Sequence, residues 1–149
     1  MLITYDKPDG TVEQVSTDDL SAIEYADIEE VLDGTSWRQI EDRVTDQDPT
    51  AMRAVLWVVR KRQQPNLAFV DVDVPGWRRR LKARIERQEI DEVLQNLLAE
   101  DLAQASEDSA IQVMLPHLRK LAHDKADLDA ALEALGKGHL VKRTSASEG

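Results

Sequence analysis

A run of six apolar residues, Ala54 to Val59, lies within the stretch that follows Asp48-Pro49. An N-cap Asp accepts the unpaired N–H groups of a helix start and Pro fits the first helical position, so a helix is predicted to begin there. It is predicted to run to about Gln63, before Pro65. Because residues 54–59 are apolar on every side of such a helix, neighbouring elements must bury all its faces. The chain is therefore predicted to fold around this central helix.

The residues before the central helix supply elements that can cover it. Two β-prone runs, 2–5 and 11–15, flank a turn rich in Pro, Asp and Gly and predict a short N-terminal β-hairpin. A first helix is predicted after Thr17, closed by Gly34 as a left-handed cap. A second is predicted from Ser36, with Gln39 as its capping-box partner. Residues 1–74 are thus predicted to form a β-hairpin followed by a small helical domain.

Pro75-Gly76 is the predicted boundary between two halves of different charge. Residues 1–74 hold 16 acidic and 7 basic residues, a net charge of −9. Residues 76–149 hold 13 acidic and 12 basic residues, a net charge of −1. The uneven charge therefore supports a boundary at this dipeptide.

The second half is predicted to be helical over residues 76–135. An apolar stripe from Trp77 to Leu102 predicts one long amphipathic helix with a phase shift near Gln88. Two shorter helices follow, the first kinked or started by Pro116 and the last capped by Gly136. Residues 136–149 show no period and are predicted to form a flexible tail. The predicted fold class is mainly α, with a short N-terminal β-hairpin.

Composition excludes several classes of function. The chain has 149 residues, a net charge of −10 and no cysteine, which excludes disulfides, thiolate metal sites and a cysteine nucleophile. No apolar stretch is long enough to span a bilayer and no signal-peptide pattern begins the chain, which predicts a cytosolic protein. The negative charge repels phosphate backbones, so nucleic-acid binding would need a strong local exception.

The motifs of catalysis and metal binding do not converge on a site. The histidines do not form a His-Glu-x-x-His pair, and only His123 has a carboxylate, Asp127, one helical turn away. That pair is interpreted as solvated, and the abundant carboxylates as a solvated face, because no spacing singles out two with different surroundings. The sequence therefore predicts no catalytic residue, no metal and no cofactor, and a protein that is not an enzyme.

Six basic residues lie within ten positions at the predicted start of the long helix: Arg78, Arg79, Arg80, Lys82, Arg84 and Arg87. Positive charge at a helix N-terminus opposes the helix dipole, so helix stability does not explain the cluster. The first interpretation is a solvated face, and the second is docking on an acidic protein surface, which includes the chain's own first half. Nucleic acid is the least favoured interpretation because Trp77 alone supplies an aromatic ring.

The apolar stripe from Ile90 to Leu102 also has two interpretations. Such a stripe is more often part of a core than a groove for a partner helix. If a partner binds in the second half, the stripe and the basic cluster are expected to supply the contact. The candidate partner-binding residues are Trp77, Arg78, Arg79, Arg80, Ile90, Leu94, Leu97 and Leu98.

The first half carries a recognisable order of segments. A turn with Asp9-Gly10 precedes residues 28–34, Ile-Glu-Glu-Val-Leu-Asp-Gly, and residues 35–40, Thr-Ser-Trp-Arg-Gln-Ile. Asp48-Pro49 then opens the helix containing residues 54–62, and Pro-Asn-Leu-Ala-Phe-Val-Asp-Val follows at 65–72. This order resembles the tail assembly chaperones of long-tailed bacteriophages, particularly those that infect actinobacteria. The similarity covers residues 1–74 and consists of helix edges and core positions without a catalytic motif.

The resemblance implies a non-enzymatic protein that binds the long, largely helical tape-measure protein in the host cytoplasm and is absent from the mature virion. Many members of the family also have a longer form made by ribosomal frameshifting, which is a second implied partner. Leu135-Gly136-Lys137 can be encoded as CTG-GGA-AAG, which contains a heptamer that permits slippage by one base. Gly136 equally fits an ordinary helix cap. Neither nucleic acid nor a membrane is an implied partner.

A small acidic regulator or inhibitor is the alternative function. Such a protein would use the first-half carboxylates to occupy a basic site on a host protein. Its binding would weaken strongly as salt is added, and its partner would come from the host rather than the phage. An enzyme is disfavoured because no convergent site is found.

Overall fold

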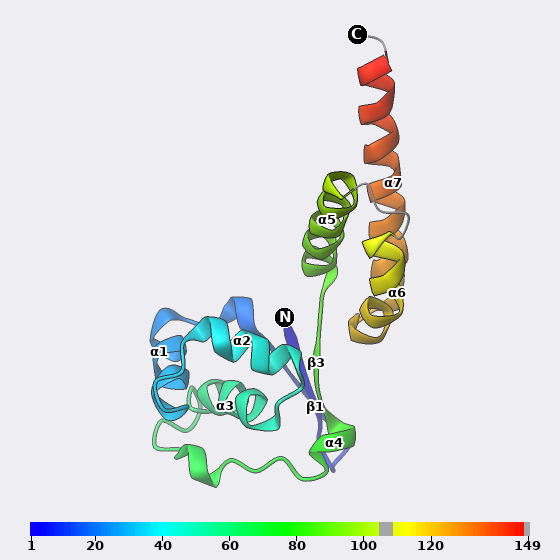
Figure 1. Ribbon diagram of the computed structural model, residues 1–149. Helices are drawn as coiled ribbons and strands as arrows, with labels where there is room; N and C mark the ends of the chain where they lie inside the picture. Colours follow the sequence, from blue (N-terminus) through cyan, green and yellow to red (C-terminus); the bar gives the residue numbers. More distant parts are fainter. Residues whose placement is uncertain (105–108, 148–149) are drawn as a thin grey trace. The chain divides into compact units, whose positions relative to one another are not determined.

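The computed structural model describes residues 1–104 and 109–147, with side chains up to Gly136 (Figure 1). Helices predominate and a small antiparallel sheet lies near the N-terminus, which confirms the predicted mainly α fold class. The chain divides into two compact units, Met1–Arg84 and Ile85–Gly149, here called unit 1 and unit 2. The division follows Arg84, whereas the sequence placed it at Pro75-Gly76.

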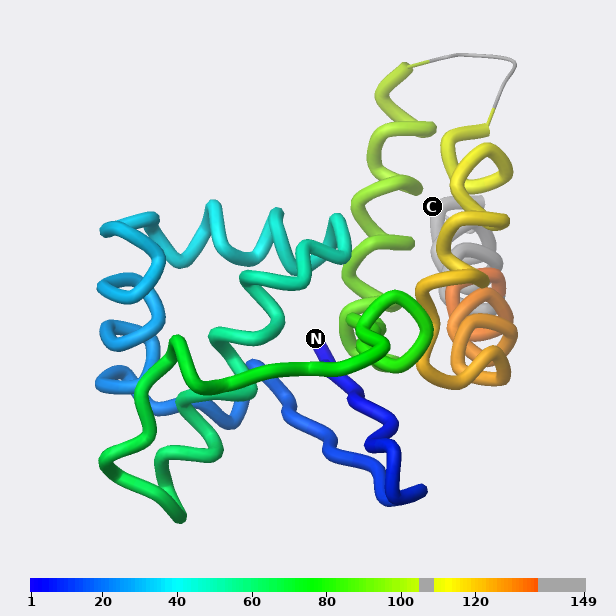
Figure 2. Tube along the Cα trace, turned by 90° about the horizontal axis from the view of Figure 1, so that it is seen from below, coloured from blue at the N-terminus to red at the C-terminus, as the bar shows by residue number. Residues whose placement is uncertain are grey.

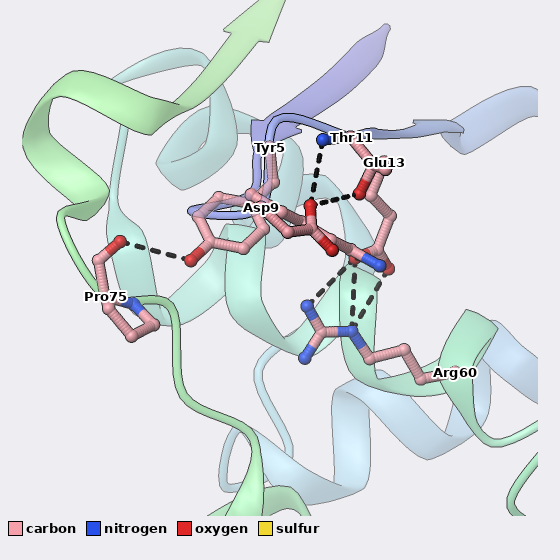
Figure 3. Close-up of polar contacts among 7 residues, drawn as sticks. Tyr5, Asp9, Thr11, Glu13, Arg60 and Pro75 are labelled. Atoms are coloured by element: carbon pink, nitrogen blue, oxygen red, sulfur yellow. Dashed lines mark hydrogen bonds and ion pairs between the residues drawn. The ribbon is translucent and has the colours of Figure 1, made fainter.

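The sheet of unit 1 has three strands in the order β2-β1-β3. β1 (Leu2–Asp6) and β2 (Val12–Ser16) form the predicted antiparallel hairpin, whose trace is visible in Figure 2. Gly10 has a φ of +90° in its turn, a conformation that side chains disfavour. Asp9 accepts hydrogen bonds from the N–H and hydroxyl of Thr11 at 2.9 and 2.6 Å (Figure 3), so local turn chemistry fixes the hairpin.

The first helix, α1 (Ala22–Val31), begins later than predicted. Thr17 starts the short 3-10 helix η1 (Thr17–Asp19) instead. Ser21 is the N-cap of α1, because its capping box with Glu24 satisfies N–H groups that Thr17 cannot reach. Gly34 has the predicted left-handed conformation, with a φ of +75°.

The next two helices, α2 (Trp37–Thr45) and α3 (Pro49–Arg60), begin where the sequence predicts. The capping box of Ser36 and Gln39 is present at the start of α2. The Asp48 carboxylate accepts two N–H groups of the first turn of α3, at 2.8 and 3.4 Å. Because these starts depend on neighbouring residues alone, the sequence locates them correctly.

Helix α3 is the buried centre of unit 1, as its composition predicts. Seven of its twelve residues are buried, and α1 and α2 lie beside it (Figure 1). The indole N–H of Trp57 donates to Leu67 O at 2.8 Å, and its ring meets Phe69 edge to face. The segment after α3, including the 3-10 helix η2 (Phe69–Asp71), therefore folds back over the helix.

Three consecutive basic residues at the end of α3 each pair with a carboxylate of another element. The N···O distances are 2.9 Å for Arg60 and Glu13, 3.1 Å for Lys61 and Asp27, and 3.0 Å for Arg62 and Glu24. Glu13 lies on β2, and its carboxylate accepts hydrogen bonds from both the Nε–H and an Nη–H of Arg60 (Figure 3). The helix C-terminus, which favours cations, is thus tied to the hairpin and to α1.

The segment Trp77–Arg84 is not the start of a long helix, and this prediction is wrong. α4 (Trp77–Arg80) is a single turn, and β3 (Leu81–Arg84) pairs antiparallel with β1. The i, i+4 spacing of Leu81 and Ile85 fits a helix, but Leu81, Ala83 and Ile85 also alternate and all three are buried. The edge of β1 that β2 leaves unpaired favours a strand at β3. No pattern within the segment itself indicates this pairing.

The outer edge of β3 is covered by one side chain. Gln47 follows α2 with a φ of +64°. Its amide accepts from Ala83 N–H at 2.9 Å and donates to Ala83 O at 3.1 Å. These two bonds replace the neighbouring strand that an edge lacks.

Unit 2 consists of α5 (Arg87–Ala103), α6 (Ala110–Leu121) and α7 (Lys125–Ser147). α5 packs against both other helices (Figures 1 and 2). Pro116 lies inside α6. α7 continues through Gly136, so the predicted cap is wrong, and the predicted tail is helical in its backbone to Ser147. Residues 148–149 of that tail lie outside the described residues.

Hydrogen bonds join the elements of unit 2 at two places. The Asp101 carboxylate near the end of α5 accepts from the Ser109 hydroxyl at 2.8 Å and from Ala110 N–H at 2.5 Å. The Ala110 bond, with help from Ser109, lowers the pKa of Asp101. Ile85 forms a parallel bridge with Ala122, between α6 and α7. The starts of α5 and α6 are thus both fixed by contacts within the unit.

Candidate partner-binding groove

An open apolar groove of about 540 Å³ lies between α5 and α7. From α5 it is lined by Leu94, Leu98 and Leu102, which stand four residues apart and so share one helix face. From α7 it is lined by Ala131, Ala134 and Leu135. Arg87, Asp91, Gln95 and Ala99 complete the lining.

Burial changes along the groove. Leu94 and Ala131 are each 1% exposed and form its floor. Leu98 and Leu135 are half-buried, and Leu102 is 69% exposed. The groove thus has a closed base and an apolar open end.

The polar end of the groove is neutralised within α5. Arg87 Nε lies 3.1 Å from Asp91 Oδ1, an i, i+4 pair. Because both side chains are partly exposed, the pair contributes little to stability, but it leaves no isolated charge beside the leucines. The arrangement suits an apolar helix face.

The two units differ in how completely they bury apolar residues. The main hydrophobic core of the described chain runs from Ile3 to Ala83 and lies wholly in unit 1. In unit 2 many apolar side chains remain partly exposed: Val93, Leu97, Leu98, Ile111, Met114, Leu115, Leu121, Leu132 and Leu135. Leu102 and Val113 are 69% exposed. Unit 2 therefore leaves a larger share of its apolar side chains exposed than unit 1 does.

The contact residues predicted from the sequence fall in both units. Leu94 and Leu98 lie together in the groove, whereas Leu97 is half-buried outside it. Ile90 is 0% exposed and presents no surface to a partner. The remaining four belong to unit 1.

Those four residues form the short helix α4. Trp77 packs partly buried against the core of unit 1, while Arg78 and Arg79 are exposed. Arg80 donates to Asp6 O at 3.4 Å and folds back over Gly76. Arg78, Arg79 and Arg80 therefore do not begin a long helix and do not oppose its dipole, whereas Arg87 of the same cluster is the first residue of α5.

The contribution of α7 to the groove was missed. Ala131 and Leu135 stand four residues apart in the sequence, a spacing that predicts a helix but does not say which helix it faces. Leu102 was assigned to the α5 stripe but not to the contact. Small residues on one side, opposite leucines on the other, are the signal that points to such a groove.

Two of the three histidines considered for catalysis have exposed side chains. His117 and His123 are exposed, and the backbone N–H of His123 donates to Ile85 O at 2.9 Å. The side chain of His139 lies outside the described residues. His123 and Asp127 thus have surroundings that suit the predicted solvated pair.

Comparison with known proteins adds no relative. No protein family, no curated protein and no solved structure matches the chain. Among the residues that the structure describes, no helix is both long and apolar enough to cross a lipid bilayer.

Proposed function

We propose that the chain is a tail assembly chaperone of a long-tailed bacteriophage, which binds the tape-measure protein and acts by binding rather than by catalysis. The observation that carries the proposal is the apolar groove between α5 and α7. The order of segments in residues 1–74, which resembles that family, supports it.

The groove suits a helical client. An amphipathic helix lays its apolar face into a groove by inserting side chains spaced three and four residues apart. A tape-measure chain exposes long apolar stripes before the tail tube encloses it, and Leu98, Leu102 and Leu135 can cover one. The net charge of −10 opposes aggregation while such stripes are held.

The protein works in one compartment and is made in two forms. It acts in the host cytoplasm and is absent from the mature virion. A longer form arises by frameshifting at the codons for Leu135, Gly136 and Lys137. An immunoblot of the N-terminally tagged gene with its native downstream DNA should show a minor longer product, which silent recoding of these codons removes.

Co-purification tests the contact directly. The tape-measure protein, co-expressed with the tagged chain, should be retained by the wild type and lost with Leu98→Asp/Leu102→Asp, because two carboxylates enter an apolar groove. Val113→Asp is the control for placing a carboxylate at an exposed apolar site, since Val113 is as exposed as Leu102 but does not line the groove. Circular dichroism of each variant reports folding.

Two results would contradict the proposal. Loss of the tape-measure protein with Val113→Asp as well would show that the groove has no special role. Absence of tape-measure binding, together with salt-sensitive capture of a basic host protein, would support the acidic regulator instead.

A further inference from the structure

Four basic side chains of unit 1, Arg78, Arg79, Lys82 and Arg84, are here called the basic ridge. In the part of the chain that the structure describes, no carboxylate lies within ion-pair distance of any of them. The chain has 29 acidic residues against 19 basic ones, so acidic partners are not scarce. The three bases at the end of α3 all have one. The ridge is therefore a local excess of positive charge on an acidic protein.

The backbone places Lys82 and Arg84 on one face of the sheet and keeps Arg78 close to them. Leu81 and Ala83 of β3 are buried, so the alternation of the strand places Lys82 and Arg84 on the opposite face of the sheet. Lys82 Nζ donates to Arg78 O at 2.6 Å, which joins the strand to α4. These contacts use only a few of the available donors, and the others can reach an anion.

The ridge is distinct from its neighbour Arg80. That side chain packs over Gly76 and donates to Asp6 O, so it has a structural contact within unit 1. The carboxylates of the first half do not satisfy the ridge, although the sequence allowed that interpretation. Four like charges without counterions repel one another, and an external anion would relieve this repulsion.

We propose that the basic ridge docks an acidic segment of a partner protein through carboxylate pairs with its guanidinium and ammonium groups. Guanidinium groups bind carboxylates with two parallel hydrogen bonds, which gives such contacts geometric specificity. The inference goes beyond the proposed function because it concerns a different unit from the groove and a different chemistry.

Two observations favour an acidic protein segment over nucleic acid. The net charge of −10 repels a long polyanion over distances at which salt already screens its repulsion of a short acidic segment. Trp77, the aromatic residue beside the ridge, packs against the core of unit 1, and Arg78 lies 5.5 Å from its ring centroid. Part of the ring is thus already in contact with unit 1, which leaves less of it to stack on a base.

Fluorescence anisotropy with the full-length chain tests the ridge. The probes are a fluorescein-labelled peptide of alternating Glu and Ala, about twelve residues long, and a labelled single-stranded oligonucleotide of about the same charge. In low salt the peptide should bind saturably, and more tightly than the oligonucleotide. Replacing all four ridge residues by Gln should weaken peptide binding by at least about tenfold, because each lost ion pair adds to the others.

A second quadruple variant separates the ridge from overall charge. Arg38, Arg119, Lys120 and Lys125 are all exposed and lie outside the ridge. Their replacement by Gln changes the net charge equally and should leave peptide affinity within about twofold. Equal losses in both variants, tighter oligonucleotide binding, or no peptide binding would each overturn the proposal. The Leu98→Asp/Leu102→Asp variant should still bind the peptide, so failure of the groove and failure of the ridge are distinguishable.

Discussion

The side chain of Gln47 bonds the outer edge of β3, as the backbone of a fourth strand would. Its amide bonds both the N–H and the carbonyl of Ala83, at 2.9 and 3.1 Å. Its φ is +64°, which is uncommon for a residue with a side chain. The sequence does not reveal this role, because a Gln between two helices is ordinary for a connection.

Replacing Gln47 by Ala should lower the free energy of unfolding by about 1–3 kcal/mol, since two backbone groups of β3 lose their partners. Urea denaturation followed by circular dichroism measures the change. Gln63→Ala, at an exposed site, is the control and should change stability by less than about 0.5 kcal/mol. Equal effects of the two substitutions would show that the edge contact does not stabilise the sheet.

Asp48 links stability to pH. Burial alone would raise its pKa, but hydrogen bonds from Arg43 and from the first N–H groups of α3 outweigh burial and lower it. A pKa lower in the folded state stabilises the fold above the unfolded-state pKa, about 4, and this contribution disappears as pH falls through the folded pKa.

The free energy of unfolding should therefore decline between about pH 5 and pH 2 more steeply in the wild type than in Asp48→Asn. Asn keeps the cap oxygen but has no charge to titrate. Urea denaturation at several pH values gives the comparison. Parallel declines in the two proteins would mean that other carboxylates determine the acid sensitivity.

At the scale of elements, the starts of α2 and α3 were predictable, whereas the start of α1 and strand β3 were not. Ser36 and Asp48 cap helices through atoms two or three residues away, so the sequence contains all that is needed. β3 depends on β1, almost eighty residues earlier, and its Leu81 fits the strand period with Ala83 as well as a helical period with Ile85. Gly136 was assigned as a stop, yet α7 continues through it, because glycine disfavours a helix interior by only about 1 kcal/mol.

Helix α5 should show two different responses to truncation. Leu94→Ala should cost about 2–5 kcal/mol because Leu94 is 1% exposed, whereas Leu102→Ala should cost less than about 0.5 kcal/mol because Leu102 is 69% exposed. Thermal unfolding followed by circular dichroism tests both. A large loss of stability in Leu102→Ala would show that this end of the groove belongs to the core, leaving less of it for a partner.

At the scale of the whole molecule, the sequence found half of the groove. Leu94 and Leu98 were identified from their spacing on one helix. The other wall, on α7, results from packing between helices separated by more than twenty residues. The spacing of residues within one helix does not indicate which other helix packs against it. The same limit applies to the ridge, because the sequence alone does not show that none of the carboxylates in the described residues lies within ion-pair distance of it.

The unit boundary gives a test by truncation. A fragment of residues 1–84 should fold with a cooperative transition, because the main core ends at Ala83. A fragment of residues 1–75, which follows the boundary predicted from composition, lacks β3 and its buried Leu81 and Ala83. It should be less stable or unfolded by the same circular dichroism assay. Equal stability of the two fragments would mean that β3 is dispensable for unit 1.

The strand order β2-β1-β3 also determines when each strand meets its partner during synthesis. β1 is among the first residues to be made, and its partner β3 follows only at Leu81. At translation rates of about 5–20 residues per second, the first strand waits roughly 4–15 s for its second neighbour. During that interval one edge of β1 is open to other chains. Slowing the ribosome within residues 7–80 should therefore lower the yield of correctly folded protein more than slowing it after Arg84.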